Sequence, residues 1–450
     1  MKKILAVLVF ILVAACLITP KFIAPIHQEK VVELLNKIDN TPGYSAKILS
    51  TDSAWFGSEN KVLFSFDIAQ IDSAIQDEKI DVELIIDTHY GPLLFASQGL
   101  FGLYATDIRI EGETQRSELN WDENQPLYKL SVLGGFTGNF KIADAVPSFS
   151  AKDNTVQFSG YAGQGEMTSK AFHYEGILDK ITVADTYSPL KAEGLTLSIE
   201  LNTNLAGILQ GGFYDSTTDF SLNKLSLGTD TVLSGLNIEM GSNLDHETQL
   251  GSIEVGYFIN DVVSGDFKAS DLILMTELDK LSNKFFIDYK NFADNFSAKN
   301  GSSDALYEAS FVFIQDNLAE LLAAKPEFNI TDFSGSFPEG SFEANLTSSL
   351  ANIDNPSIEE LTIPEFWLYH AMVTTNITAD ETLVTKLVER FIASQMRAPL
   401  NAPEVKQQAR LIIDGLLQQG LITLENAKYR SEITIKNGQG KIYDMTFPLM

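Results

Sequence analysis

The sequence predicts an α+β fold dominated by β-structure. We expect an N-terminal membrane helix, then a large curved and mainly antiparallel sheet, with several helices in the C-terminal part. Three observations support this: short segments of alternating hydrophobicity, turn residues between them in place of helical windows, and helix caps confined to the later part of the chain. The chain has 450 residues, of which 44% are hydrophobic, enough for one large core or two ordinary ones.

We expect three parts along the chain. Residues 1–26 form a membrane anchor or signal segment, 27–275 a β-rich meander, and 276–450 a mixed α+β part. The boundary near 275 rests on a change in composition, and a single sheet continuing across it is the alternative.

The N-terminal segment predicts export. Lys2 and Lys3 precede an uncharged apolar run, Ile4–Pro20. As a helix this run would be about 25 Å long, the lower limit for crossing a bilayer. The positive charge before it predicts that this end stays in the cytoplasm and that everything after Lys21 lies outside, so we expect an inner-membrane protein with a periplasmic body.

Cys16, the one cysteine of the chain, leaves the type of anchor open. It follows Val13-Ala14-Ala15, residues of the kind that precede the lipidated cysteine of a bacterial lipoprotein. The alternatives are a cysteine packed as a small hydrophobe in an uncleaved helix, and a cleaved signal. All three place the body on the same side of the membrane, and that body contains no disulfide.

The body begins with a helix and continues in strands. Val31–Ile38 has apolar residues at helical spacing, and Thr41-Pro42-Gly43 ends it. In Val62–Ile68 the residues alternate between apolar and polar, which is typical of a half-buried strand. Similar strands are predicted at Asp81–Asp87, Tyr104–Glu111, Leu127–Leu133, Thr155–Tyr161, Ala171–Val183, Gly194–Asn202, Thr218–Leu227, Gly235–Met240, Ser252–Ile259 and Asp266–Met275.

The C-terminal part combines helices and strands. Ala305–Ala324 predicts a helix that ends before Pro326. Thr378 and Glu381 have the spacing of a capping box, and Ala402–Gln419 has Pro403 in its first turn and Gly420 at its end. Strands are predicted at Phe342–Thr347, Trp367–Ile377, Lys428–Ile435 and Gly440–Met445, the last two joined as a hairpin around Asn437-Gly438.

The net charge of −28 argues against nucleic acid as a partner, because the chain has no basic stripe to displace counterions. Its five histidines are far apart, and none has a second ligand at the spacing of a metal site. No nucleophile elbow, phosphate-binding loop or dinucleotide fingerprint occurs. We therefore expect no enzyme activity and no cofactor. The glycine clusters Gly134-Gly135-Gly138 and Gly160-Gly163-Gly165 are interpreted as bulges and turns.

The chain has 29 phenylalanines, many on the apolar side of predicted strands. They would form either an ordinary sheet core or an apolar groove for an acyl chain or a hydrophobic peptide.

Four stretches of the chain together resemble the YdgA-like family of bacterial envelope proteins, domain of unknown function 945. The first is the N-terminal apolar segment, a helix, and then Trp55-Phe56 with Ser58, similar to the element that leads into the family's first strand. The second, His89-Tyr90-Gly91-Pro92-Leu93, resembles a His-Gly-Pro-Leu element with Tyr90 inserted.

The third stretch is Leu321–Pro326 with Phe333 and Gly335, and the fourth is Gly420-Leu421-Ile422 with Tyr429–Ser431 and Gly438. The resemblance implies an anchored envelope protein and no established reaction.

These observations lead to an expected function and two alternatives. We expect a non-enzymatic periplasmic protein, held by its N-terminal segment, whose curved sheet binds a lipid or an envelope protein partner. The first alternative is a structural or assembly protein with a filled core, acting through its edge strands. The second is a hydrolase of unfamiliar design, in which a histidine such as His89 meets a carboxylate and a nucleophile.

Overall fold

The computed structural model describes residues 2–39, 41, 43–67, 79–185, 188–297, 303–351, 353, 356–443 and 445–449. Side chains are described from Leu17 onward, except those of Ser297, Ser303 and Asp304. The chain forms two compact units. Unit 1 is Met1–Gly212 with Ile287–Phe313, and unit 2 is Phe213–Phe286 with Ile314–Met450.

Unit 1 contains an antiparallel sheet and a long N-terminal helix, α1 (Lys2–Asp39). Neighbouring strands pair in the order β1-β2-β3-β6-β8-β9-β12-β13-β14. Their bounds are β1 Tyr44–Ser53, β2 Gly57–Asp67, β3 Lys79–Tyr90, β6 Tyr104–Ile110, β8 Tyr128–Gly134, β9 Phe140–Val146, β12 Tyr161–Met167, β13 Phe172–Val183 and β14 Leu190–Leu201.

Shorter elements of unit 1 lie between these strands. They are β4 Leu93–Ala96 and β5 Gly99–Phe101, which form a separate hairpin, and η2 Gln115–Ser117, β7 Leu119–Asn120, β10 Phe149–Ala151, β11 Val156–Phe158 and α2 Leu205–Gln210.

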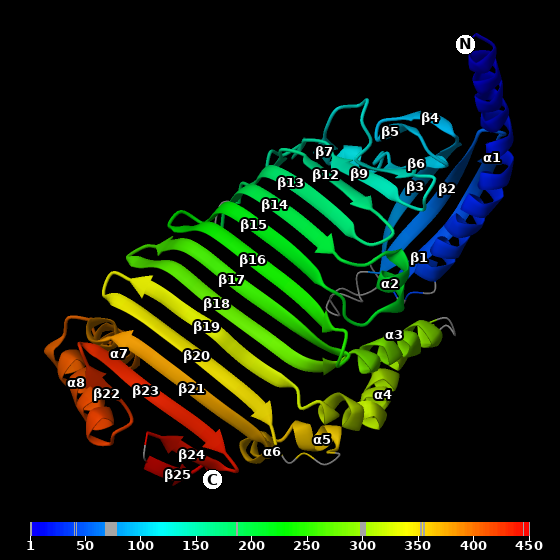
Figure 1. Ribbon diagram of the computed structural model, residues 1–450. Helices are drawn as coiled ribbons and strands as arrows, with labels where there is room; N and C mark the ends of the chain where they lie inside the picture. Colours follow the sequence, from blue (N-terminus) through cyan, green and yellow to red (C-terminus); the bar gives the residue numbers. More distant parts are fainter. Residues whose placement is uncertain are drawn as a thin grey trace. The chain divides into compact units, whose positions relative to one another are not determined.

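The second half of α1 packs on the first strands of the sheet (Figure 1). Leu35 of α1 forms a buried cluster with Ala46, Val62 and Ile86 of β1, β2 and β3. These are the apolar sides of alternating strands, as the sequence predicts, and removing them from water stabilises the contact.

The helix predicted at Val31–Ile38 is confirmed as the end of α1. The Asp39 carboxylate accepts a hydrogen bond from the Ala46 backbone N–H at 3.1 Å, which joins the end of the helix to β1. Among the described residues, no helix is long and apolar enough to cross a membrane. Most side chains of the expected anchor Ile4–Pro20, that of Cys16 included, lie outside the described residues.

Unit 2 contains a second run of antiparallel strands, β15-β16-β17-β18-β19-β20-β21-β23-β24-β25, with β22 also paired to β23. The bounds are β15 Ser216–Leu227, β16 Thr231–Asp245, β17 Leu250–Ser264, β18 Phe267–Ser282, β19 Glu327–Phe337, β20 Gly340–Leu350, β21 Ala371–Asp380, β22 Thr423–Glu425, β23 Lys428–Lys436, β24 Gln439–Ile442 and β25 Met445–Pro448. The domain boundary expected at residue 275 falls inside β18.

Six helices accompany these strands along the chain. They are α3 Asn283–Ser297 and α4 Ser303–Ala323, which have residues in both units, and α5 Ile358–Leu361, α6 Pro364–His370, α7 Glu381–Met396 and α8 Pro403–Gln418 of unit 2. The predictions for α4 and α8 are confirmed. Gly420 has a φ of 66°, the left-handed conformation that suits a residue just after a helix. The hairpin at Asn437-Gly438 is also confirmed, and both residues have positive φ.

Two predictions around β21 are wrong. Trp367–His370 belongs to helix α6 and not to a strand, because Pro364 starts the helix and the Trp367 indole N–H donates to the Leu361 carbonyl at 2.8 Å. Thr378 is not a helix cap, because it pairs within β21. Helix α7 begins after Asp380, whose carboxylate accepts hydrogen bonds from the backbone and hydroxyl of Ser341.

Two further expectations need correction. The predicted meander contains a helix, α2, which is capped by the Asn204 side chain. Gly163 and Gly165 are not bulges, because β12 keeps a continuous register with β9 and β13 across them. A Cβ at Gly163 would overlap the Tyr174 hydroxyl, so these glycines leave room for tyrosine rings lying across the strand.

Candidate functional site

The family-like residues gather at one end of the unit 1 sheet. Trp55 and Phe56 lie in the turn between β1 and β2, and Gly91-Pro92 follows β3. The Tyr90 backbone N–H donates to the Phe56 carbonyl at 2.8 Å, which joins the two segments. The chain bends at Pro92, and Leu93 begins β4.

The polar residues of this region turn inward, toward α1. Ser58 is buried, and its hydroxyl lies 2.8 Å from the Tyr90 hydroxyl. The hydroxyls of Thr88 and Thr106 are also buried and lie 3.0 Å apart. Tyr90, which in the sequence interrupts the His-Gly-Pro-Leu element, is therefore an inward-facing member of this region.

His27 of α1 completes the cluster. Its Nε2 lies 3.1 Å from the Thr106 hydroxyl, and its ring packs against Tyr104 and Tyr90 with centroids 4.6 and 5.7 Å away. The buried Nδ1 has no hydrogen-bond partner among the described residues. Burial lowers the pKa of His27 to about 4, so the ring is neutral near neutral pH. We call His27, Ser58, Thr88, Tyr90 and Thr106 the helix-docking cluster.

The next residue of α1 makes a second polar contact with the sheet. The Gln28 amide donates to the Asn60 side-chain oxygen at 2.9 Å, and the Thr51 hydroxyl donates to the same oxygen at 2.8 Å. Asn60 is almost fully buried. Since buried polar groups need their particular partners, these contacts fix the register of α1 along the sheet.

The helix-docking cluster predicts a pH dependence. A folded-state pKa of about 4 lies below the ordinary value of 6.5, so α1 docking is fully stable above pH 6.5 and weakens as pH falls toward 4. Tyr90 and Tyr104 do not titrate in this window, because burial raises both of their pKa values. Hydrogen exchange of the α1 amides should therefore accelerate between pH 6.5 and 4 relative to His27→Gln. An identical pH profile in the two proteins would contradict this account of His27.

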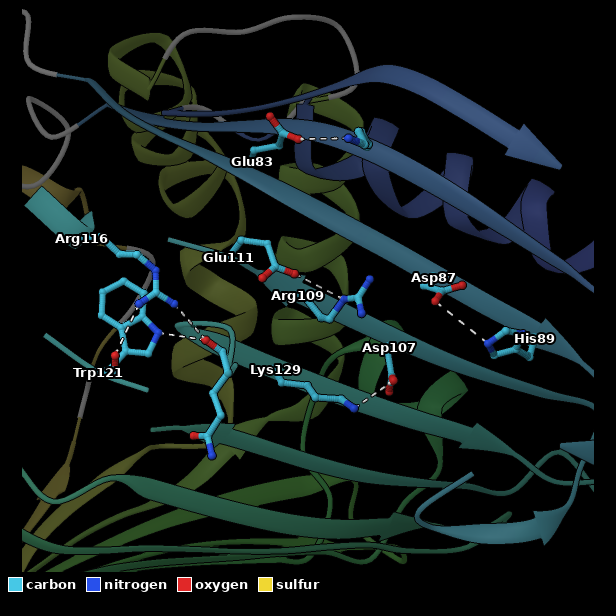
Figure 2. A network of polar contacts seen from close by, with 11 residues as sticks. Glu83, Asp87, His89, Asp107, Arg109, Glu111, Arg116, Trp121 and Lys129 are labelled. Carbon is cyan, nitrogen blue, oxygen red and sulfur yellow. Dashed lines mark hydrogen bonds and ion pairs between the residues drawn. The ribbon is translucent and has the colours of Figure 1, made fainter. Parts of the chain in front are cut away.

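His89 lies on the opposite face of the sheet. Its ring is 65% exposed and lies 4.0 Å from the Asp87 carboxylate. Figure 2 shows it at one end of a row of charged side chains on β3, β6 and β8. Lys129 pairs with Asp107 at 2.9 Å and Arg109 with Glu111 at 3.7 Å. These side chains are open to water, so this face is a solvated surface. Exposed pairs of this kind contribute less than about 1 kcal/mol each.

The other histidines lie apart from the helix-docking cluster. No group of three potential metal ligands occurs in the part of the chain that the structure describes. His173 lines a hollow of about 490 Å³ together with Ser97 and Glu166, but its ring contacts the carboxylates of Glu175 and Glu200, at 3.4 and 3.6 Å.

A second polar cluster in unit 1 surrounds Asp144 of β9. Its carboxylate accepts a hydrogen bond from the Tyr174 hydroxyl at 2.8 Å, and Tyr174 also bonds Tyr161. The Tyr128 hydroxyl lies 3.5 Å from the other oxygen, and burial together with the charge of Asp144 raises the pKa of Tyr128 to about 12. Burial also raises the pKa of Tyr174, so Tyr128 and Tyr174 remain protonated and serve as donors at neutral pH.

An apolar surface covers one face of the unit 2 strands. Residues directly opposite each other in neighbouring strands point to the same face. Three such rows are Ile238-Tyr257-Leu274-Phe333-Ala344-Ile377, Met240-Val255-Thr276-Ile330-Leu346 and Ile253-Leu278-Phe328. We call these three rows the apolar face.

Several side chains of the apolar face are open to solvent. Tyr257, Leu278, Phe328 and Phe333 are each more than 40% exposed. The opposite face of the same strands is mixed, with the polar row Glu254-Glu277-Asn329-Thr347 beside Phe258, Ile273 and Met275. An antiparallel sheet commonly covers its apolar face with other elements, so this degree of exposure marks a surface available for binding.

The sequence predicts parts of β16, β17, β18, β20 and β21, but it misses β19, which carries Phe333, and it does not predict the exposure of the apolar face. It identifies Ser58 and Gly91 through the family resemblance and misses His27, which gives no local signal because its partners Tyr90, Tyr104 and Thr106 lie 63 or more positions away in the chain.

A search of curated proteins and a search of solved structures found no match to this chain. A family model does match, over residues 1–450, and its description is "Bacterial protein of unknown function (DUF945)". Because the match covers the whole chain, the protein belongs to this family of bacterial proteins of unknown function.

Proposed function

We propose that this protein is a non-enzymatic envelope protein, held in the inner membrane by its N-terminal segment, whose periplasmic body binds the acyl chain of a lipid on the apolar face of unit 2. The positively charged start and the uncharged run Ile4–Pro20 support the anchor. Cys16 provides an alternative attachment, as a lipoprotein.

The exposed aromatic and aliphatic rows of the apolar face carry the proposal. Tyr257, Leu274 and Phe333 lie opposite one another on three successive strands, so their side chains form a continuous strip across the sheet. An acyl chain laid along such a strip removes its own surface and that of the strip from water, at roughly 25 cal/mol for each Å² of apolar area. The strip offers no charged group to be desolvated.

A charge placed in the strip should weaken binding. We expect Phe333→Glu to reduce the cross-linking yield of a photoactivatable fatty acid on the peptides of unit 2 by roughly tenfold, the equivalent of about 1.4 kcal/mol, because a carboxylate would have to lose its water beside the acyl chain. The measurement uses the full chain reconstituted in nanodiscs, at several concentrations of fatty acid.

The matched control is Leu411→Glu on α8. Leu411 is 57% exposed and Phe333 is 46% exposed, so both variants place a new carboxylate on an open apolar position of unit 2, but Leu411 lies outside the apolar face. Equal yields from both variants would argue against lipid on the apolar face.

A further inference from the structure

A second exposed apolar surface lies in unit 1 and differs in kind, because it is made of loop tips. Its members are Trp55, Phe56, Phe95, Leu100, Phe101 and Phe136, and each is between 49% and 74% exposed. We call them the aromatic end.

The topology of the sheet places these residues together. Trp55 and Phe56 join β1 to β2, the β4–β5 hairpin lies between β3 and β6, and Phe136 joins β8 to β9. The registers Gly57–His89, Tyr90–Tyr104 and Tyr104–Gly134 show that these three connections leave the sheet at the same end.

The loops of the aromatic end have no charge, although the chain as a whole carries −28. Residues 53–58, 90–106 and 134–140 contain no Asp, Glu, Lys or Arg. The connection at the opposite end of the same strands, residues 111–125, contains five acidic residues and one arginine. One end of the unit 1 sheet is therefore apolar and uncharged, which suits an apolar environment, and the other end is acidic, which suits water.

The aromatic end lies beside the part of α1 that leads to the apolar N-terminal segment (Figure 1). The Trp55 indole N–H donates to the backbone carbonyl of Leu17 at 2.9 Å. From this point α1 itself exposes Leu17, Ile18, Phe22 and Ile26, each more than half accessible. Apolar surface is thus continuous from the helix to the loops.

The backbone at Phe95 supports a functional role for the hairpin. Phe95 has a φ of 51° and is the most exposed of the six side chains, at 74%. A bulky residue with positive φ is strained by about 1–3 kcal/mol, and such strain persists where the surrounding structure holds it. The strained backbone of Phe95 holds its aromatic ring out in solvent, where the ring adds nothing to the core.

We infer that the aromatic end contacts the lipid bilayer, with Phe95, Leu100 and Phe101 in the interfacial layer. This inference rests on the anchoring proposed above. Aromatic side chains favour the level of the lipid headgroups, and an uncharged surface avoids the repulsion that anionic lipids exert on an acidic protein. The occupant is the bilayer, because the anchor in the same helix brings this end to it.

The test uses the full chain in vesicles of phosphatidylethanolamine and phosphatidylglycerol, some of whose acyl chains carry bromine near the headgroup. In a parent protein whose native Trp55, Trp121 and Trp367 are replaced by phenylalanine, a single tryptophan is placed at the aromatic end in Phe101→Trp and, as the control, at the opposite end in Thr114→Trp. Interfacial side chains lie ~5–10 Å deep, so the tryptophan at position 101 should lose about half of its emission and the one at position 114 almost none.

Flotation of the vesicles separates the possible results. Protein that floats and shows quenching at position 101 alone supports the contact. Protein that floats without quenching at position 101 overturns the inference and leaves the anchor intact; if it also sediments as a dimer, the aromatic end is a contact between copies. Protein that does not float overturns the anchor, and the membrane contact with it.

Discussion

Replacing Leu35 with alanine should loosen α1 from the sheet and lower the free energy of docking by about 2–4 kcal/mol. Leu35 is 6% exposed and packs in the cluster formed with Ala46, Val62 and Ile86. The substitution removes buried methyl groups and leaves a cavity between a helix and a sheet, which cannot fully close around it. Hydrogen exchange of the α1 and β1 amides measures the change locally, which suits a protein with two units.

The adjacent residue provides the control. Leu34 is 58% exposed, so Leu34→Ala removes little buried surface. Both substitutions replace leucine with alanine, so they change the helix propensity by the same amount. Its effect should stay within about 0.5 kcal/mol. Equal protection of α1 in the Leu35→Ala and Leu34→Ala proteins would mean that the buried cluster does not hold the helix.

Replacing Gly91 with alanine should destabilise the end of unit 1 by about 1–3 kcal/mol. A Cβ at this position would lie 2.6 Å from the Gly102 carbonyl oxygen and 2.6 Å from a Leu94 side-chain carbon. Because the first of these atoms is backbone, the loop must move to make room, and overpacking of this kind is costly. The hydrogen bond between the Gly91 N–H and the Leu103 carbonyl, 2.9 Å long, would be strained by the same movement.

Gly241→Ala is the matched control for this substitution. Gly241 also has an ordinary φ, and the nearest atom to its added Cβ is the Ser216 carbonyl oxygen at 3.7 Å. The thermal unfolding midpoint should fall in Gly91→Ala and stay unchanged or rise slightly in Gly241→Ala. A similar small change in both proteins would show that the close approach at Gly91 is easily relieved.

Much of the fold can be predicted because it depends on local patterns. The alternation in Val62–Ile68 predicts β2 as far as Asp67, and Ile68 lies outside the described residues. Pro403 and Gly420 mark the two ends of α8. The errors at Trp367 and Thr378 arise where a β-prone sequence follows a helix-starting proline and where pairing between strands overrides a capping pattern.

Less of the candidate site can be predicted, because its contacts are long-range. His27 and Thr106 are 79 positions apart, and only the folded chain brings them together. Ser58 and His89 both belong to the family-like residues, yet Ser58 faces α1 and His89 faces solvent. Ser58 lies opposite Thr88 in the sheet, and His89, the next residue along β3, points to the other side. The exposure of the apolar face depends on which elements cover it, and no local sequence pattern predicts that covering.

Mapping a cross-linked fatty acid shows directly whether lipid binds the apolar face of unit 2. The full wild-type chain in nanodiscs is exposed to a photoactivatable fatty acid, irradiated and digested, and the modified peptides are identified by mass spectrometry. We expect modified residues in β17, β18 and β19, around Tyr257, Leu274 and Phe333, in addition to those of the anchor. Modification of α1 alone, with none in unit 2, would mean that lipid does not bind the apolar face.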